Sequence, residues 1–265
     1  MRNAGVVPAG AHPQMSILQV FPDADSLTQA AAEHIVGVAA EAVTARGCFT
    51  VALAGGSTPR PVYTLLGTPA FARRMNWERV QVFWGDERGV PPNDPRSNYR
   101  FAREALLERV PLPPGNVHRL RGEDPPVRAA AAYETILRGF FAAPGAPADA
   151  SPSSGFDLIL LGLGADGHTA SLFPGHAAVT ERVRWVVAEY VAAVSMWRIT
   201  LTPILINAAA NVTFLVAGAD KAQRLHEVLE GRSRPEVLPA QAVQPTRGRL
   251  RWLVDAAAAH LRQAP

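Results

Sequence analysis

The stretch LILLGLGADGHTASLFPG, residues 158–175, begins as an apolar run and then breaks into glycines that surround an aspartate and a histidine. A short apolar run followed by a glycine-rich turn is typical of a buried strand and the turn that leaves it. Gly162, Gly164 and Gly167 also match G-x-G-x-x-G, the pattern of dinucleotide-binding turns. Such a turn opens a long helix, whereas Pro174 ends any helix here early. The glycines alone therefore give only weak support to a dinucleotide site.

Similar apolar runs recur along the chain and alternate with helical patterns. The helical patterns cover residues 25–46, starting at Asp25 or Ser26 and closing at Gly47, and then 130–141 and 221–231. This alternation predicts an α/β fold, a mostly parallel sheet flanked by helices in a modified Rossmann-like arrangement. The expected strands are 16–21, 48–54, 79–85, 117–120, 156–163, 185–191, 199–202, 211–218 and 250–254.

The size and composition of the chain bound its class. With 265 residues, 48% of them hydrophobic, it can bury a large core. We expect residues 1–15 to form a flexible tail, residues 16–265 to form a single α/β domain, and residues 142–155 to form a surface loop. The apolar runs are too short to span a membrane, and the start lacks a secretory core. The single cysteine, Cys48, excludes an intramolecular disulfide and fits the cytoplasm.

The charge pattern argues against nucleic acid as a partner. The net charge is only +3 and the arginines are scattered, without a basic stripe.

Of the 26 basic residues 25 are arginine, a bias that indicates a genome in which arginine replaces lysine wherever either serves. The one lysine, Lys221, is therefore a candidate functional residue. We expect a monomer or a small homo-oligomer that acts on a small molecule.

Four of the strand-like runs end in a turn that carries glycine and polar residues, at 55–58, 85–88, 162–168 and 218–221. In a parallel sheet the carboxyl ends of the strands share one edge, which is where open α/β sheets bind ligands. The four turns are therefore expected to meet at one crevice.

The first of these turns offers a candidate anion site. Ser57 and Thr58 stand where a helix should begin, with Pro59 suited to its first position. Thr58 suits an N-cap, and the free N–H groups of a helix start also bind phosphate, so simple capping and an anion site are both open. The turn lacks G-x-x-x-x-G-K-[ST] spacing and is not a nucleoside-triphosphate loop. Lys221 and Arg198 could add charge to the same phosphate, or could lie on the surface.

The second turn places three charges side by side after a strand. Asp86, Glu87 and Arg88 cannot all be buried unpaired, so they either solvate a loop or hold a polar ligand. In the second case, Arg88 could orient a carbonyl or sugar hydroxyls.

The third turn presents His168 as a candidate base. A neutral imidazole near pH 7 can take a proton from water, and a turn at a strand end exposes it to a ligand while the sheet holds it in place. Asp166 is close enough to orient the ring. His176 follows eight residues later with no third ligand nearby, so a zinc site is not predicted. The chain has no G-x-S-x-G elbow, which disfavours a serine hydrolase.

Taken together, the motifs at 52–63, 84–99, 158–175, 198–209 and 214–223 resemble the 6-phosphogluconolactonase family, in the family's order. The resemblance implies a fold shared with glucosamine-6-phosphate deaminases. It also implies hydrolysis of 6-phospho-D-glucono-1,5-lactone to 6-phosphogluconate, the second step of the oxidative pentose phosphate pathway, without a metal or other cofactor.

The resemblance also assigns roles to residues. His168 would be the general base that activates water, Asp166 would support it, and Arg88 would contact the lactone end. The phosphate would be held by Gly56, Ser57, Thr58, Arg198 and Lys221. Further substrate contacts are expected from Gly55, Asp86, Glu87, Gly164 and Gly167. The lead-in to Arg198 reads VSMW rather than the family's proline-rich sequence, which puts the rim near Arg198 in question.

Two other functions remain open on the same scaffold. An amino-sugar-phosphate deaminase or isomerase also uses a histidine at a strand end, and it would release ammonia from glucosamine 6-phosphate. A non-catalytic sugar-phosphate sensor would bind phosphate ligands without turnover; such sensors usually carry a separate DNA-reading module, for which this chain leaves no room.

Overall fold

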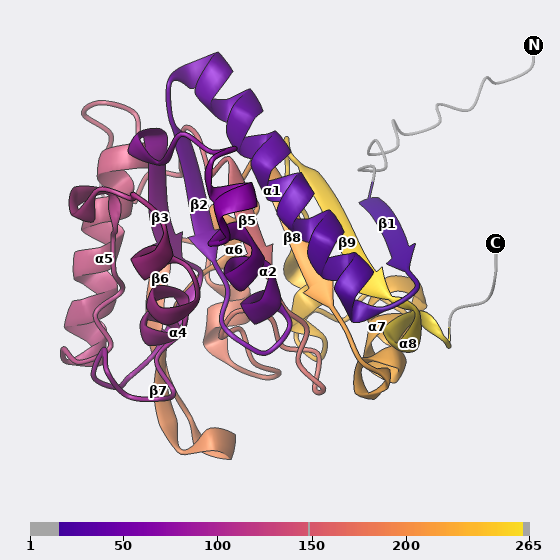
Figure 1. The fold of residues 1–265 in the computed structure, drawn as a ribbon. Helices are drawn as coiled ribbons and strands as arrows, with labels where there is room; N and C mark the ends of the chain where they lie inside the picture. Colours follow the sequence, from indigo (N-terminus) through magenta and orange to yellow (C-terminus); the bar gives the residue numbers. More distant parts are fainter. Residues whose placement is uncertain (1–15, 148, 262–265) are drawn as a thin grey trace, which may run out of the picture.

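The computed structural model describes residues 16–147 and 149–261, so the tail predicted for residues 1–15 lies outside the described residues. Its centre is a six-stranded parallel sheet in the order β1-β9-β8-β5-β2-β3, and β4, β7 and β6 form a second, antiparallel sheet (Figure 1). The strands are β1 Ser16–Phe21, β2 Phe49–Leu53, β3 Val80–Trp84, β4 Asp86–Arg88, β5 Leu158–Leu161, β6 Val186–Val191, β7 Met196–Leu201, β8 Asn211–Val216 and β9 Arg249–Asp255.

Helices cover both faces of the parallel sheet, with α1 and α2 on one side and α5 on the other (Figure 1). The α-helices are α1 Ala24–Arg46, α2 Pro59–Leu66, α3 Pro69–Ala72, α4 Asn98–Ala105, α5 Pro126–Phe141, α6 Pro203–Ile206, α7 Ala222–Glu230 and α8 Ala256–Ala259. Short 3-10 turns complete the chain: η1 Trp77–Arg79, η2 Leu107–Arg109, η3 Pro114–Asn116, η4 Ala177–Thr180, η5 Ala192–Val194, η6 Ala219–Lys221 and η7 Pro239–Ala242.

The strand β5 explains why the opening stretch is apolar without alternation. Leu158 and Leu160 join the hydrophobic core that contains α1, whereas Ile159 and Leu161 join the core that contains α5. Side chains of a strand alternate between faces, so a strand covered on both faces must be apolar at every position. The predicted parallel α/β fold is confirmed. No helix in the described ranges has the length and apolarity needed to cross a bilayer.

Three local predictions need correction. The expected strand at 117–120 is reduced to one bridge between Val117 and Val82. The segment Asp86–Arg88, expected as a turn, is strand β4, because it pairs with β7 of the second sheet. The first helix begins one or two residues early, since the Asp23 carboxylate accepts a hydrogen bond from the Ser26 N–H and caps it. None of the described residues of segment 142–155 lies in a helix or strand, as expected for a loop.

The strand order places a topological switch point between β2 and β5. From β2 the chain continues to β3 on one side, whereas from β5 it continues to β8 on the other. Where neighbouring strands send their connections in opposite directions, a crevice opens beyond their carboxyl ends. The turns at 55–58 and 162–168 therefore face each other across this crevice.

His34 on α1 makes the stability of the fold sensitive to acid. Its Nε2 lies 3.0 Å from Oγ1 of the buried Thr213 on β8. Burial lowers the pKa of His34 from 6.5 to about 4, and the charge of Arg251 acts in the same direction. The unfolded chain binds this proton near pH 6.5 and the folded chain only near pH 4, so stability is full above that window and is lost as pH falls through it. The shift corresponds to about 3 kcal/mol in the free energy of unfolding.

Urea unfolding of the wild type and of His34→Gln measures this contribution. Glutamine can still hydrogen-bond to Thr213 but does not titrate. Between about pH 7 and about pH 4, the free energy of unfolding of the variant should therefore fall by about 3 kcal/mol less than that of the wild type. Equal losses in the two proteins would contradict the prediction.

Candidate active site

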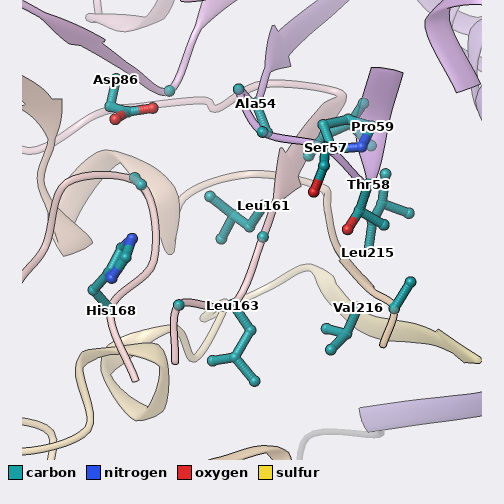
Figure 2. A pocket seen from close by; sticks show the side chains of 18 of the residues that line it. Ala54, Ser57, Thr58, Pro59, Asp86, Leu161, Leu163, His168, Leu215 and Val216 are labelled. Carbon is teal, nitrogen blue, oxygen red and sulfur yellow. The ribbon is translucent and has the colours of Figure 1, made fainter. Parts of the chain in front are cut away.

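A cavity of about 220 Å³ opens beyond the carboxyl ends of β2 and β5 (Figure 2). Its lining residues come from the segments 54–59, 85–88, 160–170 and 215–221, so the four segments that were expected to meet do meet here, although the second is strand β4 rather than a turn. The predicted site residues that line it are Gly55, Gly56, Ser57, Thr58, Asp86, Arg88, Gly164, His168 and Lys221. Those outside the lining are Glu87, Asp166, Gly167 and Arg198.

His168 is held by the turn that follows β5. Its Nδ1 lies 2.5 Å from Oδ1 of Asp166, and its backbone N–H donates to the same oxygen over 3.1 Å. The carbonyl of His168 accepts a hydrogen bond of 2.9 Å from the Gly164 N–H, which closes the turn. With 32% of its side chain exposed, the imidazole is fixed at one edge and accessible at the other.

The charge of Asp166 sets the tautomer of this imidazole. Burial raises the pKa of Asp166, but the hydrogen bond and charge of His168 outweigh it and lower the pKa to about 2. An ionised carboxylate only accepts hydrogen bonds, so the neutral imidazole carries its proton on Nδ1. Its Nε2 then has a free lone pair, and no described residue hydrogen-bonds to it. This is the arrangement that a general base requires.

Donors for an anion stand on the opposite side of the cavity. Figure 2 shows the hydroxyl groups of Ser57 and Thr58 across the pocket from His168. Thr58 precedes α2 as predicted, but its backbone is already helical and its hydroxyl makes no capping hydrogen bond. None of the backbone N–H groups of residues 55–58 donates to another described residue. Unused donors before a helix favour the phosphate site over simple capping.

The ammonium group of Lys221 belongs to the same cavity. Lys221 ends η6 at the start of α7 and lines the cavity after β8, with 24% of its side chain exposed. Its Nζ lies 3.0 Å from Oδ2 of the exposed Asp220, a pair that solvent screens. The one lysine of the chain, which was predicted to be a functional residue, thus lies at the predicted crevice.

Asp86 presents a buried carboxylate to the cavity wall. Its oxygens accept hydrogen bonds from Nδ2 of Asn98, over 3.0 Å, and from Oγ of Ser171, over 2.6 Å. A Cβ on Gly55 would lie 1.8 Å from Oδ1 of Asn98, so only glycine fits there. Neither Asn98 nor Ser171 was predicted from the sequence to belong to the site. They stand 12 and 85 positions from Asp86, and no local pattern links such residues.

Two arginines lie side by side on the antiparallel sheet, and of the two only Arg88 lines the cavity. Arg88 on β4 is directly opposite Arg198 on β7, and the Nε atom of each is buried without a hydrogen-bond partner. Burial, and then the charge of Arg88, lowers the pKa of Arg198. Two neighbouring cations, of which Arg198 is partly desolvated, favour the binding of an anion between or beside them.

The model of the family described as glucosamine-6-phosphate isomerases/6-phosphogluconolactonase matches residues 22–252 of the chain. The chain belongs to this family. A relative named 6-phosphogluconolactonase, from Nostoc sp., is 41% identical over 244 residues, which cover 91% of this chain and 96% of the relative.

Solved structures extend this family likeness. The 6-phosphogluconolactonase from Trypanosoma cruzi superimposes with a TM-score of 0.82 at 28% identity, covering 96% of this chain and all of that one. A monomeric glucosamine-6-phosphate deaminase gives a TM-score of 0.75 at 21% identity over 93% of this chain. At that identity the second match shows only the shared fold, as the family resemblance implied.

Within this family member, Glu87 does not lie where substrate contact was expected. It is 2% exposed, and burial raises its pKa. Its carboxylate oxygens accept hydrogen bonds from the hydroxyl of Ser97 and from the backbone N–H groups of Arg88, Asn98 and Tyr99. Successive side chains of a strand point to opposite faces, so Glu87 points away from the cavity that Asp86 and Arg88 line. Its carboxylate instead anchors the start of α4.

Gly167 is likewise outside the cavity. Its φ of +91° favours glycine, and a Cβ there would lie 2.8 Å from the side chain of Leu238. Its carbonyl accepts a hydrogen bond of 3.0 Å from the Ala240 N–H. The residue therefore lets the turn pack against η7 rather than contact a ligand.

Proposed function

We propose that the chain hydrolyses 6-phospho-D-glucono-1,5-lactone to 6-phosphogluconate, with His168 as the general base and without a metal. The observation that carries the proposal is the position of the His168–Asp166 pair across one cavity from the unused donors of Ser57 and Thr58. A substrate with a dianionic phosphate at one end and an ester carbonyl at the other matches such a cavity.

The mechanism follows from the chemistry of the groups. The phosphate binds at Ser57, Thr58 and Lys221, which places the lactone carbonyl beside His168. As water attacks the carbonyl carbon, Nε2 takes its proton, and Asp166 stabilises the imidazolium that forms. Arg88 offsets the charge that develops on the carbonyl oxygen. The ring C–O bond then breaks, and the imidazolium returns the proton to the departing ring oxygen.

The test measures lactone opening above its spontaneous rate, together with ammonia release from glucosamine 6-phosphate. We expect rapid opening, no ammonia, and no loss of rate with a chelator. Ammonia release without lactone opening would favour the deaminase, and phosphate-ligand binding without either reaction would favour the sensor.

Lys221→Met should weaken substrate binding more than it slows the chemistry. Removing a charge-assisted contact to phosphate should raise KM by about 10- to 100-fold while kcat changes by only a few-fold. Lys221→Arg, which keeps the charge, is the matched control and should recover much of the affinity. With unphosphorylated gluconolactone the Met variant and the wild type should have equal KM values. A KM effect on both substrates would remove Lys221 from the phosphate site.

A further inference from the structure

The ring of Phe173 lies against the imidazole of His168. Their centroids are 4.4 Å apart and their planes differ by 25°, which is a stacked arrangement. Phe173 is 7% exposed and is not among the residues that line the cavity, so it contacts the imidazole rather than a ligand bound there. Phe173 lies within the stretch 158–175, but the sequence predicted no role for it.

The hydrogen bond to Asp166 cannot by itself aim the reacting nitrogen. A bond through Nδ1 sets the tautomer, but small combined rotations about Cα–Cβ and Cβ–Cγ can still tilt the imidazole while that bond is kept. Stacking against a flat ring restricts that motion, because it holds the two planes together. The two contacts together determine the direction of Nε2.

Phe173 is itself held from several sides. The guanidinium of Arg198 lies over its ring, 5.9 Å from the centroid, and the ring of His176 lies 6.0 Å away at a tilt of 58°. His176 is in turn paired with Glu189 on β6, with Nδ1 3.2 Å from Oε2. The ring thus connects the imidazole to two strands of the antiparallel sheet.

We propose that Phe173 is a positioning residue, whose ring fixes the plane of the His168 imidazole and so aims Nε2 at the attacking water. This rests on the proposed function of His168. A displaced base slows proton transfer without changing how the phosphate end binds.

The kinetic test compares Phe173→Leu with Phe173→Tyr, after thermal unfolding has shown each to be folded. Leucine keeps an apolar contact but has no ring face, so kcat should fall about 10-fold while KM stays within about two-fold. Tyrosine keeps the ring, and kcat should stay within about two-fold of wild type. In a His168→Gln background the leucine substitution should cause no further loss, since there is no imidazole to aim. An equal loss with tyrosine, or a full loss in that background, would overturn the proposal.

A second measurement does not depend on the reaction. Stacking on Phe173 should shift the imidazole ¹H resonances of His168 upfield in the NMR spectrum, and Phe173→Leu should abolish the shift. An unchanged spectrum would overturn the stacking, whatever the activity. A wild type that shows the shift but opens no lactone would refute the proposed function and would leave Phe173 as a structural contact only.

Discussion

His168→Gln is expected to lower kcat for lactone hydrolysis by about 1,000-fold, with KM changed by only a few-fold. Glutamine keeps a polar side chain of similar reach but cannot accept and return a proton at neutral pH. The proposed phosphate donors, Ser57 and Thr58, lie across the cavity and are not changed by the substitution, so binding should persist. Residual turnover reflects orientation and charge stabilisation alone.

The measurement is the rate above spontaneous opening, with the binding of 6-phosphogluconate followed separately by calorimetry. His260→Gln is the matched control, because His260 lies beyond α8, outside the cavity lining, and bonds only to the carbonyl of Ala257 among the described residues. It should turn over at the wild-type rate. Turnover of His168→Gln within about 10-fold of wild type would show that another group is the base.

Gly164→Ala is expected to lower kcat by about 100-fold through geometry alone. A Cβ at this position would lie 2.0 Å from Nδ1 of His168 and 2.7 Å from Oδ1 of Asp166, which are impossible contacts. The methyl group must push the imidazole off the carboxylate, so the tautomer and direction of Nε2 are both lost. The turn lies at the surface edge of the sheet, and we expect the variant to remain folded.

Gly139→Ala within α5 is the control for the glycine substitution itself, since a Cβ there meets nothing within 4 Å. It should retain wild-type kcat and should not be less stable, because alanine favours a helix. Wild-type activity of Gly164→Ala would mean that the His168–Asp166 contact is not needed for turnover. Activity loss accompanied by unfolding in the circular dichroism spectrum would also count against the geometric explanation.

The strands of the parallel sheet could be predicted because the patterns that indicate them lie within short stretches of sequence. The strand Leu158–Leu161 is apolar at each position and is followed directly by glycines, so periodicity and turn chemistry indicate both its burial and its end. Parallel strands bring such turns to one edge by topology. The meeting of the His168 turn with the Ser57–Thr58 turn therefore needed no knowledge of side-chain contacts.

The antiparallel sheet could not be predicted in the same way. Strand β4 has only three residues, all charged, and it exists because β7 supplies its hydrogen bonds from more than a hundred positions along the chain. Pairing with β7 turns Glu87 away from the cavity and sets Arg88 opposite Arg198. No pattern within residues 84–99 could show which of the three charged side chains faces the cavity and which is buried away from it.

The sequence by itself therefore determined the α/β class, the edge of the sheet that carries the site, and the turn that presents His168, because each depends on neighbouring residues. Only the tertiary structure decided which polar side chains reach the cavity and which support it. Asn98 and Ser171 meet at Asp86, and Phe173 meets His168 in a stacked pair, through packing of side chains in three dimensions. Such contacts depend on distance in space, which local periodicity does not encode.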